Sequence, residues 1–486
     1  MINRSMILQP IEKKDYKAKG VAATPSFLLD DGTIGEMVYD GEETKFAISR
    51  GGEWRYDNRL ALRTGETFLP YSAKNNLIKN RVVLLPSAVV EYDDEGELLE
   101  RIQGFIHRYV DVSPLFERLC VYYVFFTWIY DDFNELPYLR VLGDAGSGKT
   151  RFLLTVGALC HKPIFASGAS TVSPLFRALD VFRGTLLIDE GDFPQSDEKA
   201  EIVKILNNGN AKGFPVLRSE TVVGKGGKEY NPRAYHVYGP KLIATRSLFL
   251  DRALESRCLT EEMGHRRLRE NVPINLPAAF WREAEQLRNQ LLHFRFQHLG
   301  KHAVSEALVD RRIEPRLNQV FAPLLSIIEA PQIRVDLLGV MREYHRQFVS
   351  DKGMTEEGRL LEVIAERRKL DDILSIKEIA HHFAEKHEAE YDQKVTPKWV
   401  GGLIRRRLHL RTERRKEGYV ISPGEGEKIN RLLERYGLAQ SDSPAGENPT
   451  EEGREASSPP EKAKNGILSD EHGEPGERRR GDAPTA

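Results

Sequence analysis

The sequence has few cysteines and lacks a long apolar run. Its 486 residues include three cysteines, Cys120, Cys160 and Cys258, which are too few and too far apart to form a disulfide framework. This composition favours a reducing compartment, and we expect a cytoplasmic protein. The most apolar stretch, Cys120–Tyr130, has eleven residues, whereas a helix that crosses a membrane needs about 20. We therefore expect a buried helix there and no membrane partner, and Met1–Lys19 has no apolar run that would indicate a secretory signal.

The sequence also has no excess of one charge. It contains 71 Lys and Arg and 73 Asp and Glu, so its formal net charge is −2, which excludes a uniformly basic protein that coats nucleic acid. The last 48 residues, Ala439–Ala486, hold eleven acids and six bases, so they carry −5 and the other 438 residues carry +3. This segment is rich in Ser, Pro, Gly and Glu and has almost no large apolar residues. Because it cannot form a core, we expect it to be disordered.

Changes in the pattern of expected elements divide the sequence into five parts. Short strands and turns fill the first part, including candidate strands at Arg81–Leu85 and Ala88–Tyr92. From Leu136 strands and helices alternate, which predicts a parallel sheet, and helical periodicity follows through Lys369. The parts are a β-rich region of unknown role (1–110), an α/β core (111–263), a helical segment (264–369), a basic unit (370–437) and the tail expected to be disordered (438–486).

A glycine-rich motif follows the first strand of the α/β core. Gly143–Thr150 reads Gly-Asp-Ala-Gly-Ser-Gly-Lys-Thr and fits the P-loop pattern, with a strand candidate before it and a helix candidate, Arg151–Cys160, after it. In such a loop the glycines let backbone N–H groups curl round phosphate oxygens, the lysine supplies a cation and the threonine hydroxyl ligates Mg²⁺. The sequence therefore predicts a site for ATP and Mg²⁺ formed by Gly143, Asp144, Ala145, Gly146, Ser147, Gly148, Lys149 and Thr150.

Two further strands of the core end in polar side chains. Thr185–Glu190 is an apolar strand that ends in two carboxylates about 40 residues after the P-loop lysine, as a Walker B strand does. We expect Asp189 to hold Mg²⁺ through water and Glu190 to orient or deprotonate the attacking water. Gly239–Arg246 reads as a third core strand, and Thr245 near its end is expected to contact the γ-phosphate and the attacking water.

The segment after this third strand resembles AAA+ ATPases, in which a short helix carries an arginine finger. The resemblance covers about Pro137–Glu329, and the triplet Ser-Arg-Cys at 256–258 is similar to the clamp-loader subset. It implies that Arg257 is the finger that reaches the γ-phosphate of a neighbouring subunit, with Arg252 as the alternative. An ordinary surface ion pair is the other interpretation of Arg257. The resemblance also implies that the helical segment is a lid and that an arginine of this lid acts as a sensor of the nucleotide. Arg316 is the candidate, and Arg311, Arg312 and Arg288 are the alternatives.

Two strand candidates before the third core strand flank a turn that reads Gly224-Lys225-Gly226-Gly227-Lys228. A hairpin at this place resembles superfamily 3 and minichromosome-maintenance helicases of plasmids, phages and mobile elements, although Thr245 stands where those helicases usually carry Asn. The resemblance implies that the hairpin lines the channel of a ring and that Lys225 and Lys228 contact DNA. An exposed turn whose lysines only increase solubility is the alternative.

The basic unit resembles a winged helix-turn-helix. Two helices are expected at Ser375–His387 and from Thr396 onward, followed by a hairpin around Arg415–Gly418. Between Lys394 and Lys416 the net charge is +8, which favours binding to DNA phosphates, while the acidic tail or a partner protein is the alternative ligand. The candidate DNA contacts are Lys398, Arg405, Arg406, Arg407, Arg414 and Arg415.

Together these patterns predict an α/β fold, with an AAA+ core, a helical lid, a β-rich N-terminal region and a C-terminal winged helix. The function that they favour is a replicative DNA helicase of a mobile element, which hydrolyses ATP with Mg²⁺ at subunit interfaces of a homo-hexamer. The catalytic residues would be Lys149, Glu190, Thr245 and Arg257. The alternative is an origin-recognition-like initiator or loader, in which ATP controls assembly on DNA and turnover is slow.

Overall fold

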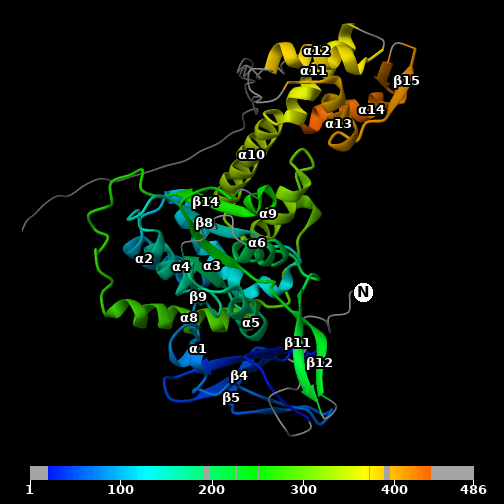
Figure 1. The fold of residues 1–486 in the computed structure, drawn as a ribbon. Helices are drawn as coiled ribbons and strands as arrows, with labels where there is room; N and C mark the ends of the chain where they lie inside the picture. The colour runs from blue at the N-terminus through cyan, green and yellow to red at the C-terminus, as the bar shows by residue number, and fades with distance from the viewer. Residues whose placement is uncertain are drawn as a thin grey trace, which may run out of the picture. The chain divides into compact units, whose positions relative to one another are not determined.

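The chain folds into two compact units in a computed structural model (Figure 1). The structure describes residues 20–189, 197–224, 227–249, 251–370, 373–387, 394–416 and 418–438. The first unit ends at Arg359 and the second begins at Leu360. Among the described helices, none combines the length and the apolar character that a membrane span requires.

The N-terminal strands form two small sheets, coloured blue in Figure 1. The first is an antiparallel sheet in which two glycines with positive φ, Gly51 and Gly52, make the tight turn between β4 and β5. Its strands are β2 (Ser26–Leu28), β3 (Ile34–Tyr39), β4 (Thr44–Arg50) and β5 (Glu53–Asp57). The second contains β1 (Val21–Ala23), β7 (Thr67–Leu69) and β6 (Leu60–Ala61), in that order. The expected β-rich character of this region is present.

The strands expected at Arg81–Leu85 and Ala88–Tyr92 are wrong. Beyond one isolated bridge at Val83, this stretch has no strand in the structure. The Asn289 side-chain oxygen accepts hydrogen bonds from the backbone N–H groups of Ser87 (2.9 Å) and Ala88 (3.3 Å), and its backbone oxygen accepts one from Val90 (3.2 Å). The apolar side chains of this stretch therefore indicate that it is buried and do not indicate a strand. Asn289, in place of a neighbouring strand, accepts hydrogen bonds from its backbone N–H groups.

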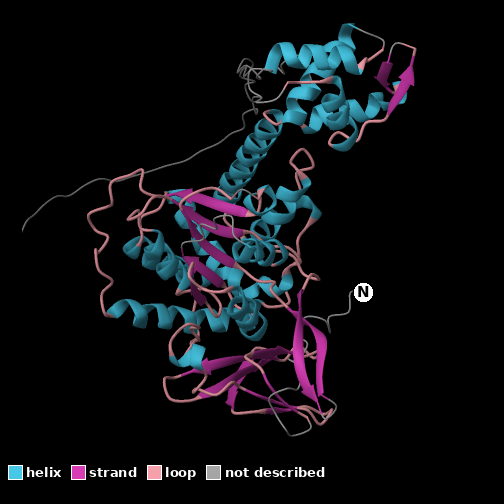
Figure 2. Cartoon of the chain, viewed as in Figure 1, coloured by secondary structure: helices cyan, strands magenta, loops and turns pink. Residues whose placement is uncertain are grey.

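The centre of the first unit is a five-stranded parallel sheet, which confirms the predicted parallel core (Figure 2). Its order is β14–β8–β13–β10–β9. The strands are β8 (Tyr138–Leu142), β9 (Ile164–Ser167), β10 (Leu186–Asp189), β13 (Lys241–Thr245) and β14 (Cys258–Glu262). Because β13 lies between β8 and β10, the ends of the three strands that carry the predicted site motifs are neighbours at one edge of the sheet.

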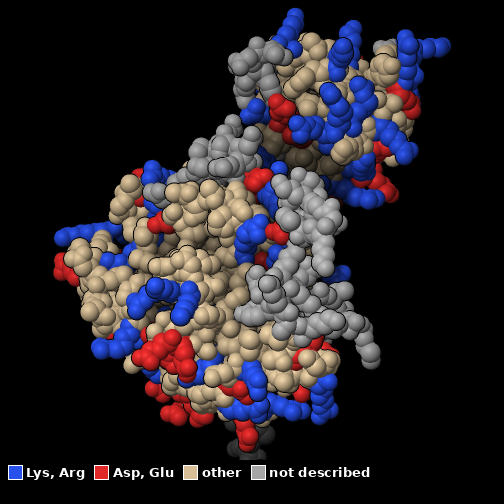
Figure 3. Space-filling view, turned by 60° about the horizontal axis from the view of Figure 1, so that its bottom comes forward, with Lys and Arg blue, Asp and Glu red and all other residues tan. Residues whose placement is uncertain are grey.

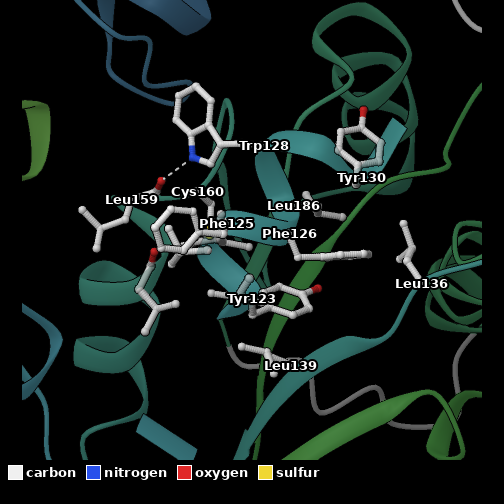
Figure 4. Close-up of a cluster of buried hydrophobic side chains, with 14 of the residues drawn as sticks. Tyr123, Phe125, Phe126, Trp128, Tyr130, Leu136, Leu139, Leu159, Cys160 and Leu186 are labelled. Carbon is white, nitrogen blue, oxygen red and sulfur yellow. Dashed lines mark hydrogen bonds between the residues drawn. The ribbon is translucent and has the colours of Figure 1, made fainter. Parts of the chain in front are cut away.

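The apolar run of the sequence lies in α3 (Pro114–Ile129), which is buried almost throughout and confirms the expected buried helix. Its aromatic side chains fill the space beside the sheet (Figure 4). The indole nitrogen of Trp128 donates to the Leu159 carbonyl (2.9 Å), and the Tyr123 hydroxyl donates to the Pro137 carbonyl (2.9 Å). Helix α2 (Glu95–Tyr109) packs on α3 and on α4 (Lys149–Gly157), the helix after the glycine-rich motif.

A buried ion network joins the N-terminal strands to the core, so the expected boundary at residue 110 does not separate two compact units. The carboxylate of Glu36 on β3 contacts Arg295 (2.7 Å) and Lys162 (2.9 Å), and Arg295 also contacts Asp131 (2.6 Å). Glu36, Lys162 and Arg295 are buried, and one continuous apolar core surrounds both regions. Paired charges in a low-dielectric interior fix the two regions against each other.

The helical segment after the sheet packs on the same core. Its helices are α8 (Ala279–His298), α9 (Pro315–Ile327) and α10 (Pro331–Gly353), and each of them contacts α3. The apolar periodicity that predicted α8 is confirmed, since Phe280, Ala284, Leu287, Leu291 and Leu292 are all buried.

A long antiparallel hairpin leaves the first unit before β13. It consists of β11 (Val216–Gly224) and β12 (Gly227–Tyr235), which follow α5 (Val172–Phe182) and α6 (Asp197–Asn208). At its base the guanidinium groups of Arg218 and Arg233 lie over the rings of Phe176 (5.3 Å) and Tyr235 (4.9 Å). The base is therefore anchored on α5, while the far end extends away from the core (Figure 1).

The second unit has its own apolar core. It contains α11 (Glu356–Leu370), α12 (Ile376–His387), α13 (Pro397–Arg406), the strands β15 (Thr412–Arg415) and β16 (Gly418–Ile421), and α14 (Gly426–Arg435). The sequence-based boundary at 369–370 was placed too late, because Leu360, Leu361, Val363 and Ile364 of α11 are buried in this second core. A single bridge joins Ser375 to Val420 of β16.

Candidate active site

The glycine-rich motif forms a loop between β8 and α4, as its flanks predicted. Gly146 and Gly148 have φ of 82° and 97°, a conformation that favours glycine, and Gly148 caps α4. A Cβ atom on Gly143 would lie 2.6 Å from the Met263 carbonyl oxygen, so that position has room only for glycine. The loop therefore directs backbone N–H groups and the start of α4 toward one space.

Lys149 is buried at the start of α4 and points back into this loop. Its ammonium group donates to the carbonyl oxygens of Gly143 (2.6 Å) and Asp144 (2.7 Å). Two carbonyl dipoles and the surrounding loop fix the position of the cation. It can exchange these acceptors for phosphate oxygens without leaving its place, which is the chemistry expected of a P-loop lysine.

Thr150 and Asp189 meet across the sheet edge. The Thr150 hydroxyl donates to a carboxylate oxygen of Asp189 over 2.7 Å, although the two residues are 39 positions apart in the sequence. Asp189 ends β10, and a hydroxyl and a carboxylate at one point supply the oxygen ligands that Mg²⁺ prefers. Both residues were predicted from the sequence as metal ligands, and the structure brings them together.

Thr245 lies between the strands that carry these two motifs. It ends β13 in register with Leu142, and its backbone oxygen accepts a hydrogen bond from Gly143 (3.2 Å). The side chain is fully buried, and its hydroxyl has no hydrogen-bond partner in the described part of the chain; the same holds for the Ser147 hydroxyl. A buried polar atom without a partner is costly, which makes these two hydroxyls candidates for contact with a bound ligand.

A cavity of about 640 Å³ opens beside the glycine-rich loop, and sequence reasoning did not identify its far wall. The residues that form this wall are Asp111, Arg246 and most of 261–268. Two contacts hold the 261–268 segment in place. The Glu261 carboxylate accepts from the Ser113 hydroxyl (2.7 Å), and Arg269 pairs with Asp111 (3.0 Å). The signal in the sequence was slight, a single glycine, Gly264, which lies two residues after β14 with a φ of 94° in the structure.

Arg257 lies at the opposite edge of the sheet from this cavity. It precedes β14, whose first residue pairs with Tyr138 at the start of β8, and β8 has five residues. The length of β8, about 15 Å, therefore separates Arg257 from the glycine-rich loop of its own chain. One arginine side chain cannot cover that span, so Arg257 cannot reach the glycine-rich loop of its own chain.

Arg316 lies beside Arg257, away from the cavity. Burial and the neighbouring guanidinium of Arg316 lower the pKa of Arg257, and burial lowers the pKa of Arg316. Arg257 donates to the Asn207 side-chain oxygen and to the Ala253 carbonyl (2.7 Å), while Asn207 also donates to Asp251 (3.1 Å). Arg316 is not among the residues that line the cavity, and its contact with a nucleotide stays a prediction.

Some predicted site residues lie outside the described residues. These are Glu190, the residue after Asp189, and Lys225 at the hairpin tip. Lys228 lies in β12 in register with Val223, so it is the second residue after the tip. The tail from residue 439 is also outside the described part.

The basic residues of the second unit are exposed on α13 and on the hairpin. Lys398, Arg405, Arg406 and Arg407 are exposed, as are Arg414 and Arg415. The guanidinium groups of Arg405 and Arg406 lie over Gly401 and Gly402 of α13. Both glycines are buried, so there is room for the two arginine side chains to lie close against the helix backbone.

Comparisons with known proteins give remote neighbours. No family model and no curated protein matches the sequence. Two apo structures of the NrS-1 C-terminal region are similar to this one, with TM-scores of 0.34 and 0.32, 11% identity, and coverage of 79% and 80% of this chain and 95% of theirs. A structure of JCV helicase with a bound acetamide compound has a TM-score of 0.23 and 14% identity, over 52% of this chain and 62% of that chain.

Proposed function

We propose that the chain is an ATP-dependent AAA+ ATPase that acts on DNA, and that it works as a replicative helicase of a mobile element. The observation that carries the proposal is the contact of Thr150 with Asp189 beside the buried Lys149 (2.7 Å). Three residue types from two motifs that are far apart in the sequence meet at the edge of a parallel sheet, where ligands of such sheets bind.

The residues at this edge fit ATP and Mg²⁺. The loop amides and Lys149 would hold the β- and γ-phosphates, and Thr150 and Asp189 would hold Mg²⁺. The buried hydroxyls of Ser147 and Thr245, which have no partner among the described residues, belong to the loop and to the end of β13. The bound Mg²⁺ would neutralise charge on the phosphates. Glu190, the next residue along from Asp189, would orient or deprotonate the attacking water.

The position of Arg257 and Arg316 supports a site shared between two copies of the chain. Arg257 lies at the edge of the sheet opposite the glycine-rich loop, and burial together with the charge of Arg316 lowers its pKa. A polyanion from a neighbouring copy would relieve that repulsion. We propose a ring of copies, six as in the helicases that the sequence resembles, in which each copy supplies these arginines to the ATP of the next.

The second unit supports the DNA part of the proposal. The order of α11, the bridge at Ser375, α12, α13 and the β15–β16 hairpin resembles a winged helix, with α13 as the helix that would enter a groove. On the face drawn in Figure 3, Lys and Arg side chains outnumber acids over this unit. Lys225 and Lys228 at the hairpin of the first unit would contact the DNA backbone inside the ring.

The central test is nucleotide binding and turnover by two variants. Lys149→Ala should abolish tight ATP binding, because it removes the cation at the phosphates. Glu190→Gln should keep binding and stop turnover, since an amide is a poor base. Binding is measured by fluorescent-nucleotide titration, and hydrolysis with single-stranded DNA, duplex DNA and no DNA. Lys301→Ala, which removes an exposed lysine of the same unit, is the control.

ATP binding by Lys149→Ala equal to that of the unchanged protein would reject the site. The initiator interpretation predicts a different pattern, in which DNA does not stimulate turnover, no forked duplex is unwound, and Glu190→Gln keeps sequence-specific binding to duplex DNA. Unwinding of a fork that depends on Glu190 would support the helicase.

A further inference from the structure

The second unit contains a groove that the proposed DNA contacts do not explain. It has a volume of about 1140 Å³ and lies between the start of α12 and the β15–β16 hairpin. Two aliphatic side chains border it and are unusually exposed, Leu370 at 75% and Ile373 at 47%. The buried Val420 forms part of its wall. Exposed apolar side chains beside a concave surface are typical of a site that binds another segment of protein.

The polar rim of this groove contains several cations, of which Arg415 pairs with Glu413 (2.8 Å). Lys377, Arg414 and Lys416 line the groove, and no acid in the described chain lies within ion-pair distance of any of them. The acid of the lining, Glu378, already contacts Arg367 (3.6 Å). The groove therefore offers apolar area together with three cations that pair with no described acid, which suits a short segment that combines aliphatic and acidic residues.

The sequence of this chain contains such a segment. Within residues 439–486 the only large apolar side chains are Ile467 and Leu468, and they are adjacent. Asp470, Glu471 and Glu474 follow them directly. Two aliphatic residues close to three acids match the two exposed aliphatic residues of the groove and the three cations that have no partner among the described acids.

The tail is long enough to reach the groove. The structure describes the chain as far as Leu438, and 28 residues separate it from Ile467. A flexible linker of that length has an end-to-end distance of about 30 Å. That distance is comparable with the diameter of a folded unit of this size, about 25–30 Å. Because the segment is tethered, its effective concentration at the groove is on the order of 1 mM, so modest intrinsic affinity is enough.

We propose that Ile467–Glu474 of the chain's own tail docks in this groove, with the aliphatic pair against Leu370 and Ile373 and the acids on Lys377, Arg414 and Lys416. Arg414 is also a proposed DNA contact, so the docked segment occludes part of the DNA surface. This second part rests on the proposed function, whereas the docking does not. The tail is then an internal competitor that DNA must displace.

Docking is tested on the full chain with one label in the tail. The three native cysteines are buried, so Ser469→Cys provides a selective site for a fluorophore. Fluorescence anisotropy of this label should be high at low salt and fall when the segment is released. Release is expected from the pair Ile467→Ser and Leu468→Ser, from the groove pair Leu370→Ser and Ile373→Ser, and from Lys377→Glu. The matched control is Val335→Ser with Met354→Ser, two exposed apolar residues outside the groove.

DNA binding gives the second readout. With an effective concentration of about 1 mM and a segment affinity of about 100 µM, release should raise the affinity for duplex DNA about tenfold. Anisotropy that neither serine pair changes would overturn the docking, and anisotropy that depends on protein concentration would assign the groove to the tail of another copy. Docking without any gain in DNA affinity on release would overturn the occlusion. Failure of every form to bind DNA would reject the proposed function and leave the docking result intact.

Discussion

At the scale of single residues, His161 is a buried titratable group whose environment makes the stability of the fold depend on pH. It lies among Glu36, Lys162, Arg295 and Asp131, and its imidazole nitrogen is 3.4 Å from a Glu36 oxygen. Burial, with the charges of Lys162 and Arg295, lowers the pKa of His161 to about 4, and Glu36 opposes that shift. The folded protein therefore keeps this imidazole neutral where an unfolded chain would protonate it.

His161→Gln should flatten the acid limb of the stability curve. The histidine pKa is about 6.5 in an unfolded chain, so between that pH and about 4 the unfolded state binds the extra proton and stability falls as the pH falls. From pH 7 to pH 5 this one group accounts for a loss of about 2 kcal/mol. Urea unfolding at the two pH values measures it. Equal losses for the variant and the unchanged protein would show that His161 is not the group that titrates.

At the scale of elements, the sequence predicted those whose motifs impose their own geometry. The glycine-rich loop, β10 and β13 follow from residue types that backbone conformation or metal chemistry require. The prediction of strands within residues 81–92 was wrong because the apolar side chains of this segment pack without pairing to another strand. Its backbone N–H groups instead donate to Asn289, about 200 residues away. The role of Arg316 stays a prediction for a related reason. A helix start can be recognised from Pro315, but the element beside which it packs depends on contacts that are distant in the sequence.

Arg257→Ala should leave ATP binding intact and reduce hydrolysis by about 10³ or more, the usual value of an arginine finger. Because the side chain is separated from its own site by the length of β8, the loss should be repaired in trans. Lys149→Ala copies cannot bind ATP but can supply Arg257, so a mixture of the two inactive variants should recover part of the hydrolysis. Arg316→Ala should behave in the same way with a smaller loss.

Arg252→Ala is the matched control, since Arg252 is an exposed arginine of the same short helix, α7 (Arg252–Glu255). Its hydrolysis rate should remain near that of the unchanged protein. If Arg252→Ala lost hydrolysis while Arg257→Ala hydrolysed ATP normally, Arg252 would be the arginine finger. Inactivity of all mixtures, with both single variants still assembled, would contradict a shared site.

At the scale of the whole molecule, the order of elements was easier to predict than the division into units. Composition separated the tail, and the change from strands to alternating elements located the sheet. The N-terminal strands carry no such boundary signal, because Glu36 joins them to Lys162 and Arg295 only in three dimensions. Likewise, α11 reads as one more helix of a series, and only its buried face shows that it belongs to the second core.

The second core leads to the last prediction. A fragment of residues 356–438 contains α11 to α14 and all the buried apolar residues of that core, so it should unfold cooperatively in urea as an independent unit.

If α13 and its arginines meet DNA phosphates, the fragment should bind duplex DNA with an affinity that falls as salt rises. Each phosphate contact contributes about 0.9 to the slope of log K against log salt, so changing Arg405, Arg406 and Arg407 to Ala should reduce the slope by about 2.7. Arg431→Ala with Arg435→Ala removes exposed arginines from α14 and should leave it unchanged. An equal slope for the triple variant and the unchanged fragment would mean that this arginine run serves a ligand other than DNA.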